Sequence, residues 1–360
     1  MKILTVAGTR PQLVKIAAVS RKLRKEFEEI LINTGQHYDY NMNGIFFDEL
    51  NIPKPDYNLG VGSGPHGKQT GEMMIKLEEI FEKEQPDVVL VYGDTNSTLA
   101  GALVASKRLI PLIHIEAGLR SFNKDMPEEQ NRILTDHLSD LLLIPSENAK
   151  SNLSKEGIEN GVFNVGDVMM DAVLYNIKLA EEKYSLSDFE LEKNEYVLGT
   201  IHRAENTNNP DKLKAILNSF TELEKEVFLP LHPRTNKLIK EFGFDEIVKT
   251  SNNIRIVEPI SYLEMLLIEK NAYAIVTDSG GVQKEAYFAQ VPCLTLRDQT
   301  EWTETIDLGW NKLIDPLNDN LADELKTIRP GQEIFDAYGN GQAADKIIDK
   351  IKEYYIKWKS

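Results

Sequence analysis

The chain has 360 residues, which at about 150 residues per domain predicts two domains, each large enough for its own core. Its 41% hydrophobic and 27% charged residues are ordinary for a globular protein and exclude a disordered or fibrous chain. The net charge of −16 argues against nucleic acid as a partner, because affinity for a nucleic-acid backbone comes mostly from Lys and Arg. The single cysteine, Cys293, excludes a disulfide framework and a Cys-rich zinc site.

No segment of the sequence has the pattern of a targeting signal or a membrane span. The apolar stretch 3–7 is too short for a signal peptide, and no apolar run approaches the ~18 residues that cross a bilayer. We therefore expect a cytoplasmic protein that does not bind a membrane.

Short apolar runs alternate with helical patterns along most of the chain. Most of these runs are apolar on both faces, which is typical of parallel strands that helices cover on both sides. We expect strands at residues 2–7, 30–34, 87–92, 112–116, 141–144 and 162–165, and, after a polar stretch at 180–193, at 196–201, 227–231, 254–257, 273–277, 293–296 and 313–315. The pattern predicts an α/β protein of two doubly wound Rossmann-like domains with a cleft between them.

We place the N-terminal domain at residues 1–170 and the C-terminal domain at 171–341. The last segment, 342–358, has its apolar residues on one helical face and is long enough to pack across a domain boundary. In open α/β sheets, ligands bind beyond the carboxyl ends of the strands. The residues that follow each strand are therefore the candidates for function.

Basic and acidic residues follow the strands of the first domain. Arg10 and Lys15 stand near a helix N-terminus, which suits an anion, although a plain turn with two solvated cations would look the same. Asp94 has the alternative role of helix N-cap, and a carboxylate at Glu116 is costly unless it is paired. Glu128 opens a helix, where acids interact well with the helix dipole and where it could pair with the arginine four residues later. Three acids at neighbouring strand ends, with basic residues among them, favour a catalytic cluster.

In the second domain, His202 and His232 follow strands and are candidates for a cleft. His114 lies within a strand of the first domain, and we interpret it as a core histidine bonded to the backbone. No metal site is expected, because neither His114 nor Cys293 has partner ligands at a recognisable spacing.

The sharpest motif is the run from Thr277 to Ala286, which follows a strand and opens a helix. Ser279, Gly280 and Gly281 would expose backbone N–H groups at the helix N-terminus, which is how a diphosphate is held. Glu285 lies one turn further, where it can accept hydrogen bonds from ribose hydroxyls. An empty helix cap is the alternative.

A second glycine pattern, at residues 62–67, matches the dinucleotide fingerprint G-x-G-x-x-G. It follows no clear buried strand and contains a proline, so we interpret it as a loop and expect no cofactor.

As a set, these motifs resemble those of the non-hydrolysing UDP-N-acetylglucosamine 2-epimerases. The shared motifs occur in the family's order and spacing and are Gly8-Thr9-Arg10-Pro11, Gly93-Asp94-Thr95, Glu116-Ala117-Gly118-Leu119-Arg120, Pro127-Glu128-Glu129-x-Asn131-Arg132, His202-Arg203 and Thr277-Asp278-Ser279-Gly280-Gly281. The resemblance spans nearly the whole chain. It implies a GT-B fold with two Rossmann-like domains, a cleft, a last helix that crosses back to the first domain, and a homodimer.

The family exchanges UDP-GlcNAc and UDP-ManNAc by inverting carbon 2 of the sugar. The hydrogen on carbon 2 is not next to a carbonyl, so a base cannot remove it to leave a stabilised carbanion. Elimination avoids the problem: UDP leaves carbon 1 as the proton leaves carbon 2, and the resulting glycal is re-protonated on the other face. This route needs a general base, a general acid and cations on the departing diphosphate.

By this resemblance, Asp94, Glu116 and Glu128 are the acid–base carboxylates, and His202 assists at the diphosphate or the leaving oxygen. The remaining matches to the family's active site are Arg10, Lys15, Arg132 and His232, with Ser279, Gly280 and Gly281 at the diphosphate and Glu285 at the ribose.

Two departures from the common family pattern resemble a sister group that epimerises UDP-2,3-diacetamido-2,3-dideoxy-glucuronate. Gln12 replaces the usual glutamate of Arg-Pro-Glu, and Arg203-Ala204-Glu205 replaces Arg-Arg-Glu. A neutral Gln12 near Arg10 is expected to favour the negatively charged uronate. The alternative enzyme is a GT-B glycosyltransferase with a UDP-sugar donor, which would need an acceptor. A UDP-sugar-binding regulator without turnover is the non-enzymatic alternative.

Overall fold

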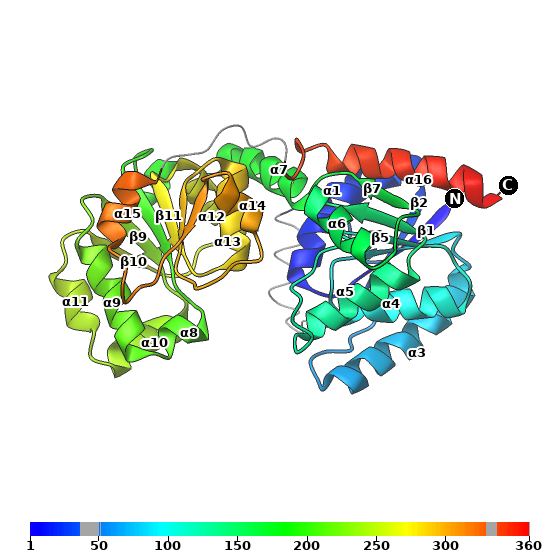
Figure 1. Cartoon of the computed structure of the whole chain (residues 1–360), viewed down its shortest axis with the longest axis horizontal. Helices are drawn as coiled ribbons and strands as arrows, with labels where there is room; N and C mark the ends of the chain where they lie inside the picture. The colour runs from blue at the N-terminus through cyan, green and yellow to red at the C-terminus, as the bar shows by residue number, and fades with distance from the viewer. Residues whose placement is uncertain (37–49, 51, 329–336, 360) are drawn as a thin grey trace. The chain divides into compact units, whose positions relative to one another are not determined.

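The computed structural model describes residues 1–36, 50, 52–328 and 337–359, which form two compact units (Figure 1). The N-terminal unit consists of Met1–Ala172 together with Phe335–Ser360, and the C-terminal unit consists of Val173–Ile334. Each unit is built around one parallel sheet with helices packed on it. The expected α/β class with two doubly wound sheets is therefore confirmed.

Within the described residues, the N-terminal unit has a seven-stranded sheet in the order β3-β2-β1-β4-β5-β6-β7. Its strands are β1 (Lys2–Ala7), β2 (Glu28–Asn33), β3 (Tyr57–Asn58), β4 (Val88–Tyr92), β5 (Leu112–Ile115), β6 (Leu141–Ile144) and β7 (Val162–Asn164). Its helices are α1 (Arg10–Glu26), α3 (His66–Glu84), α4 (Asn96–Lys107), α5 (Pro127–Leu138), α6 (Glu147–Lys155) and α16 (Ala343–Lys359). Helix α7 (Val168–Lys183) begins in this unit and continues into the next.

The described part of the C-terminal unit has a six-stranded sheet in the order β10-β9-β8-β11-β12-β13. Its strands are β8 (Tyr196–Thr200), β9 (Glu226–Pro230), β10 (Ile254–Val257), β11 (Ala274–Thr277), β12 (Cys293–Thr295) and β13 (Asn311–Leu313). Its helices are α8 (Ala204–Thr207), α9 (Pro210–Thr221), α10 (Pro233–Glu241), α11 (Asp245–Thr250), α12 (Tyr262–Asn271), α13 (Gly280–Ala289), α14 (Thr303–Asp307) and α15 (Leu321–Thr327), and a short 3₁₀ helix covers Leu186–Phe189.

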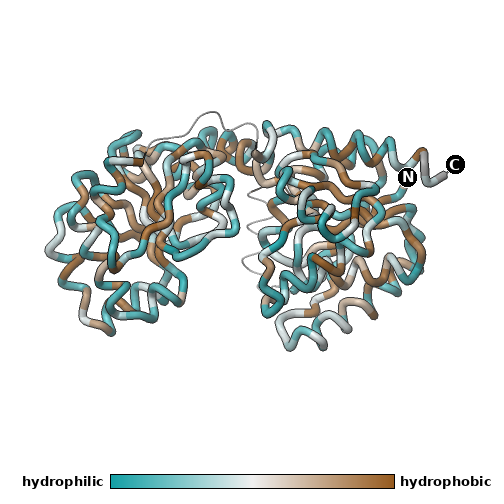
Figure 2. Tube along the Cα trace, viewed as in Figure 1, coloured by the Kyte–Doolittle hydropathy of each residue, from teal (hydrophilic) through white to brown (hydrophobic). Residues whose placement is uncertain are grey.

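The core of each unit lies where its sheet meets the covering helices. Strand β4 is buried along its whole length and shares one apolar cluster with Met73 and Leu77 of α3. In the C-terminal unit, Val197 of β8 and Leu229 of β9 belong to one cluster with Phe220 of α9. Hydrophobic residues accordingly concentrate along the strands at the centre of each unit (Figure 2). Burial of this apolar surface is the main stabilising contribution to each unit.

Besides shifts of one or two residues at the ends of most other strands, the structure corrects the sequence-based boundaries in three places. Strand β3 was not expected, and the last strand covers Asn311–Leu313 rather than 313–315. The glycine pattern at 62–67 is a loop only as far as Pro65, because α3 begins at His66.

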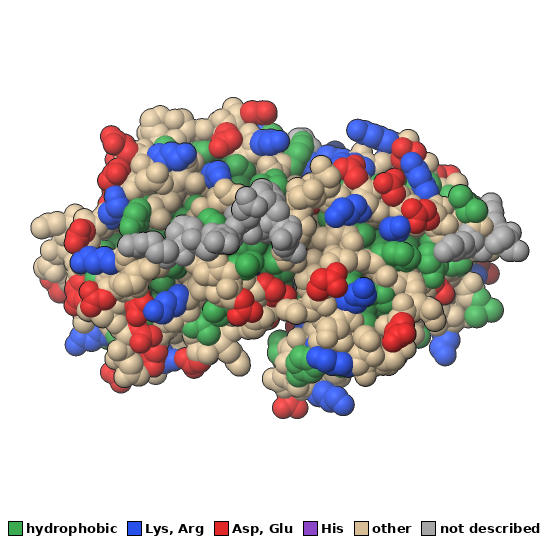
Figure 3. Space-filling view, turned by 45° about the horizontal axis from the view of Figure 1, so that its top comes forward, with side chains coloured by type: hydrophobic (Ala, Val, Ile, Leu, Met, Phe, Trp, Pro, Cys, Tyr) green, Lys and Arg blue, Asp and Glu red, His purple; other side chains and the backbone are tan. Residues whose placement is uncertain are grey.

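The distribution of charge on the surface agrees with the acidic composition of the chain. On the face drawn in Figure 3, basic side chains are interspersed with acidic ones and form no broad basic patch. None of the helices in the described residues is both long and apolar enough to cross a bilayer.

Candidate active site

Both sheets reverse their strand order at one point, and the candidate residues follow the strands there. The reversal lies between β1 and β4 in the first sheet and between β8 and β11 in the second. Such a switch point leaves a crevice beyond the carboxyl ends of the central strands. The carboxylate cluster of the first sheet comprises Arg10, Lys15, Asp94, Glu116, Glu128 and Arg132. The glycine cluster of the second comprises His202, His232, Ser279, Gly280, Gly281 and Glu285.

Two acids of the carboxylate cluster each pair with a cation. The Nζ atom of Lys15 donates to Oε2 of Glu116, and these side chains are only 12% and 10% exposed. The Nη2 atom of Arg132 donates to Oδ2 of Asp94 at 2.5 Å. A buried carboxylate is costly unless it is paired, so the cations allow both acids to lie partly buried at the sheet edge.

Lys15 interacts with both of these acids. Burial alone lowers the pKa of its ammonium group, but the combined attraction of Glu116, Asp167 and Asp94 raises that pKa above its usual value of 10.5. Lys15 therefore stays charged at neutral pH. Gly93 permits the close approach, because its φ of +60° is left-handed and a Cβ there would lie 3.2 Å from Oε2 of Glu116.

Arg132 pairs with Glu129 as well as with Asp94, rather than with Glu128 four residues earlier. Its Nη1 atom lies 3.2 Å from Oε2 of Glu129, a buried side chain that also accepts N–H groups from the loop before α5. Glu128 is exposed in the first turn of α5, and Arg10 is exposed at the first residue of α1. Both side chains are accessible to a ligand.

Next to the glycine cluster, Asp278 directly after β11 fixes the segment that carries His202. Its carboxylate accepts the backbone N–H of His202 at 3.1 Å and of Arg203 at 3.0 Å, and the side-chain amide of Asn206 at 3.2 Å. Burial would raise the pKa of Asp278, but the hydrogen bond and attraction of the His202 ring, with the N–H donors, hold it below its usual value of 3.8. The His202 ring is exposed and can meet a ligand.

The N-terminus of α13 carries the predicted anion site. Ser279 is the N-cap, and its hydroxyl accepts the N–H of Val282 at 3.4 Å. Gly280 and Gly281 form the first helical positions, whose N–H groups have no partner within a helix. The first turn of α13 therefore offers donors and the positive end of the helix dipole to an anion.

The other two members of the glycine cluster are more engaged with the fold. Glu285 is only 8% exposed and lies near the buried Glu269. His232 is exposed and caps α10, where its Nδ1 atom accepts the N–H of Arg234 at 3.2 Å.

Arg297, which follows β12, lies close to Gly280 and lines a neighbouring pocket. Its Nη1 atom lies 3.7 Å from the position that a Cβ atom on Gly280 would take, and 3.1 Å from Oε2 of Glu301.

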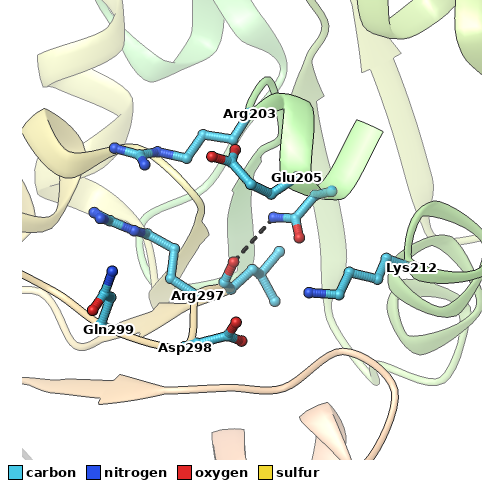
Figure 4. A pocket seen from close by; sticks show the side chains of 8 residues that line it. Arg203, Glu205, Lys212, Arg297, Asp298 and Gln299 are labelled. Carbon is cyan, nitrogen blue, oxygen red and sulfur yellow. Dashed lines mark hydrogen bonds between the residues drawn. The ribbon is translucent and has the colours of Figure 1, made fainter. Parts of the chain in front are cut away.

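The neighbouring pocket, which Arg297 lines, has a volume of about 120 Å³ and is too small for a nucleotide sugar. The ends of Arg203 and Arg297 extend to the same side of it (Figure 4). Its charged lining consists of Arg203, Lys212, Arg297, Glu205 and Asp298.

The sequence profile of the UDP-N-acetylglucosamine 2-epimerase family matches residues 21–352 of the chain. The chain belongs to this family. Membership confirms the resemblance of the motifs and makes the protein an isomerase.

Relatives of this epimerase match it over nearly its whole length. It is 51% identical to the UDP-N-acetylglucosamine 2-epimerase homolog of Methanococcus maripaludis, over 98% of this chain and 99% of that protein. It is 45% identical to the UDP-2,3-diacetamido-2,3-dideoxy-D-glucuronate 2-epimerase of Pseudomonas aeruginosa, over 98% and 99%. The solved UDP-GlcNAc 2-epimerase of Methanocaldococcus jannaschii has a TM-score of 0.89 at 45% identity, over 98% of this chain and 100% of that chain. Its complex with UDP-GlcNAc and UDP has a TM-score of 0.82, at the same identity and coverage.

Gln12 of this epimerase is buried at the start of α1 and makes hydrogen bonds within the fold. Gln12 is only 2% exposed, and its Oε1 atom accepts the N–H of Gly8 at 2.9 Å. Its Nε2 atom donates to the carbonyl of Tyr92 at 2.7 Å and to Oγ1 of Thr98 at 2.9 Å. The amide is therefore bonded within the fold, and the expected preference for a uronate sugar stays a prediction. An ionised glutamate would place a negative oxygen against the Tyr92 carbonyl.

Two residues near the glycine cluster of the epimerase were missed as site residues in the sequence. Asp278 is part of a recognised motif, but its role in fixing His202 depends on contacts 75 and 76 residues apart. Arg297 follows strand β12, and a position directly after a strand is the signal that identifies it as a candidate site residue. In the described ranges, no three His, Cys, Asp or Glu side chains group as metal ligands would.

Proposed function

We propose that this epimerase inverts carbon 2 of a UDP-N-acetylated sugar by eliminating and re-adding UDP. The observation that carries the proposal is the pairing of Glu116 with Lys15 and of Asp94 with Arg132 at one switch point. Acids held in place beside fixed cations can exchange protons with little reorganisation during the reaction. The complex of the Methanocaldococcus jannaschii relative with UDP-GlcNAc and UDP supports the substrate class.

In the first half of the reaction, a carboxylate takes the proton from carbon 2, and the electron pair of that C–H bond forms a double bond to carbon 1. The C1–O bond breaks, and its electrons leave with UDP. A second acid then protonates carbon 2 of the glycal on the opposite face, and the UDP oxygen returns to carbon 1. Asp94, Glu116 and Glu128 are the groups proposed for these transfers.

The glycine cluster holds the departing UDP in this proposal. The N–H groups of Gly280 and Gly281, with the Ser279 hydroxyl, receive the diphosphate at the N-terminus of α13. In the C-terminal unit the proposed ligands of UDP are His202, His232 and Arg297, with Glu285 at the ribose. In the N-terminal unit, Arg10, Lys15 and Arg132 are the cations proposed to bind the substrate.

Turnover in deuterated water without an acceptor tests the reaction. We expect the protein to interconvert UDP-GlcNAc and UDP-ManNAc, or their diacetamido-uronate counterparts, and to place deuterium on carbon 2. Retention of the original hydrogen in the product contradicts elimination, and turnover only with an acceptor indicates a glycosyltransferase. Asp94→Asn and Glu116→Gln should each lower turnover by ~10²-fold or more. The exposed Glu147→Gln, on α6, is the control.

The sugar itself is decided by comparing kcat/KM for UDP-GlcNAc and for UDP-2,3-diacetamido-2,3-dideoxy-glucuronate on one preparation. Relatives with each of these names are similar to this chain to nearly the same degree, 46% and 45% identity.

The proposal includes a homodimer that acts in the cytoplasm. The family resemblance supports the dimer. Light scattering at micromolar concentration should give twice the chain mass of 40.8 kDa, and the mass of one chain refutes the dimer.

A further inference from the structure

The side chain of His114 links two of the strands that carry the carboxylate cluster. His114 lies in β5, two residues before Glu116, and none of its surface is exposed. Its Nε2 atom lies 2.7 Å from the carbonyl oxygen of Gly93, the residue before Asp94. Its Nδ1 atom lies 2.7 Å from Oδ1 of Asp136 on α5. The ring therefore contacts the backbone that sets the direction of Asp94.

Asp136 is held from its other side by cationic and backbone donors. Its Oδ2 atom accepts the N–H of Gly118 at 3.1 Å and Nη1 of Arg120 at 2.7 Å, which favours the ionised carboxylate. Arg120 also donates to both carboxyl oxygens of Glu156, at 2.7 and 2.8 Å. Glu156 also lies 3.2 Å from Nε2 of His137, a ring that is 48% exposed. Apart from that ring, two carboxylates and one guanidinium leave one net negative charge in this group, which a positively charged His114 would balance.

The hydrogen-bond partners also fix the protons of the ring. A backbone carbonyl only accepts, so the Nε2 atom that faces Gly93 carries a proton. An ionised carboxylate only accepts as well, so the Nδ1 atom that faces Asp136 carries a second proton. Both ring nitrogens of His114 are therefore donors.

We propose that His114 is a buried imidazolium whose hydrogen bond to the Gly93 carbonyl holds Asp94 in position for proton transfer. His114 is a positioning residue in this role, because it acts through the turn of Gly93 and Asp94 and not on the sugar. Asp136 in turn fixes the ring and also holds the N–H of Gly118, two residues after Glu116. The effect on turnover rests on the proposed epimerase reaction, whereas the protonation of the ring does not.

Two substitutions remove the contacts of the ring one at a time. The amide of His114→Asn reaches the place of Nδ1, so it keeps the contact with Asp136 and loses the one with Gly93. The amide of His114→Gln reaches the place of Nε2 and keeps a donor for Gly93. Misplacement of a reacting group by about 1 Å costs up to ~10²-fold in rate. We therefore expect His114→Asn to lower kcat by about 10- to 100-fold with KM within about threefold, and His114→Gln to retain more of kcat.

Equal losses of kcat in the two variants, or an unchanged kcat in His114→Asn, would overturn the positioning role. Glu147→Gln, at an exposed residue of α6 outside this group of side chains, is the control and should leave kcat near that of the unmodified enzyme.

Nitrogen NMR of the full-length protein with ¹⁵N-labelled histidine tests the ring without turnover. The chain has six histidines, and the signals of His114 are those with slowly exchanging N–H protons that are absent in His114→Gln. We expect protons on both ring nitrogens at neutral pH without substrate. A single ring proton overturns the proposal even in an active enzyme. Two ring protons in a protein without epimerase activity support the imidazolium and refute the proposed function instead.

Discussion

Glu269 is a carboxylic acid that the C-terminal unit encloses completely. It lies in α12 with no exposed surface, and within the described part of the chain neither of its carboxyl oxygens has a hydrogen-bond partner. Burial, and then the repulsion of Glu285, raise the pKa of Glu269 well above its ordinary value of 4.5. A protonated Glu269 avoids a second negative charge close to Glu285, the residue proposed to contact the ribose.

The raised pKa of Glu269 predicts how stability depends on pH. Because the folded protein binds a proton that the unfolded chain releases, this stabilisation is complete below pH 4.5 and is lost as pH rises through the folded pKa. The loss is at most about 1.4 kcal/mol per pH unit for one proton. Glu269→Gln is neutral at every pH, so its melting temperature should exceed that of the unmodified protein by more at pH 8 than at pH 5. Parallel melting curves across this range contradict the prediction, and the exposed Glu258→Gln is the control.

The sequence shows which residues are candidates for the site more readily than it shows the direction in which their side chains point. The sequence predicts that His114 is a core histidine bonded to the backbone, and its contact with the Gly93 carbonyl confirms this. Its second partner, Asp136, lies 22 residues away on a helix, and no local pattern connects the two. For Gln12 the sequence suggests a role at the site, because Gln12 lies two residues after Arg10 in a functional motif. Its side chain instead points into the fold and donates to the carbonyl of Tyr92.

At the scale of elements, apolar runs locate strands well because a parallel strand between two helical layers is apolar on both faces. Strands β1, β6 and β10 begin and end where the sequence predicts. Strand β3 has two residues and is too short to produce a pattern. Strand β13 begins with Asn311, a buried amide whose Oδ1 atom accepts the Thr295 hydroxyl at 2.7 Å. Because this strand begins with a polar residue, the apolar run in the sequence does not show where the strand begins.

The N-terminus of α13 gives a prediction about UDP binding. Arg297 is 13% exposed, and its guanidinium lies beside Gly280, where it pairs with the more exposed Glu301. A diphosphate at this helix end would meet the backbone N–H groups and Arg297 together. Arg297→Gln should therefore weaken UDP binding about tenfold or more, and Glu301→Gln, which releases Arg297 from its ion pair, should strengthen it.

Calorimetric titration of the full-length protein with UDP measures both effects. Lys237→Gln removes a 75% exposed cation from α10 of the same unit and controls for the change in net charge. Equal losses of affinity in Arg297→Gln and Lys237→Gln would assign the effect to overall charge and not to the helix end.

The first and last helices of the molecule, α1 and α16, pack on each other in the N-terminal unit. Helix α16 buries Ile347 and Ile351 completely, and its first N–H groups are capped by a residue more than 170 positions earlier. Asp171 accepts the N–H of Ala343 at 3.0 Å and of Ala344 at 2.8 Å. The unit is therefore complete only when the last helix has been added to it.

This long-range cap predicts a local loss of stability in Asp171→Asn. An asparagine keeps one acceptor oxygen but turns an NH₂ group towards the second N–H, so a buried donor loses its partner. Loss of such a cap costs about 1–2 kcal/mol, and hydrogen exchange of the α16 amides should quicken about tenfold while exchange in the C-terminal unit stays the same. Asp345→Asn, which breaks only the exposed 2.6 Å pair with Lys22, should change exchange far less. Unchanged exchange in α16, or equal acceleration in both units, would show that Asp171 does not anchor the helix.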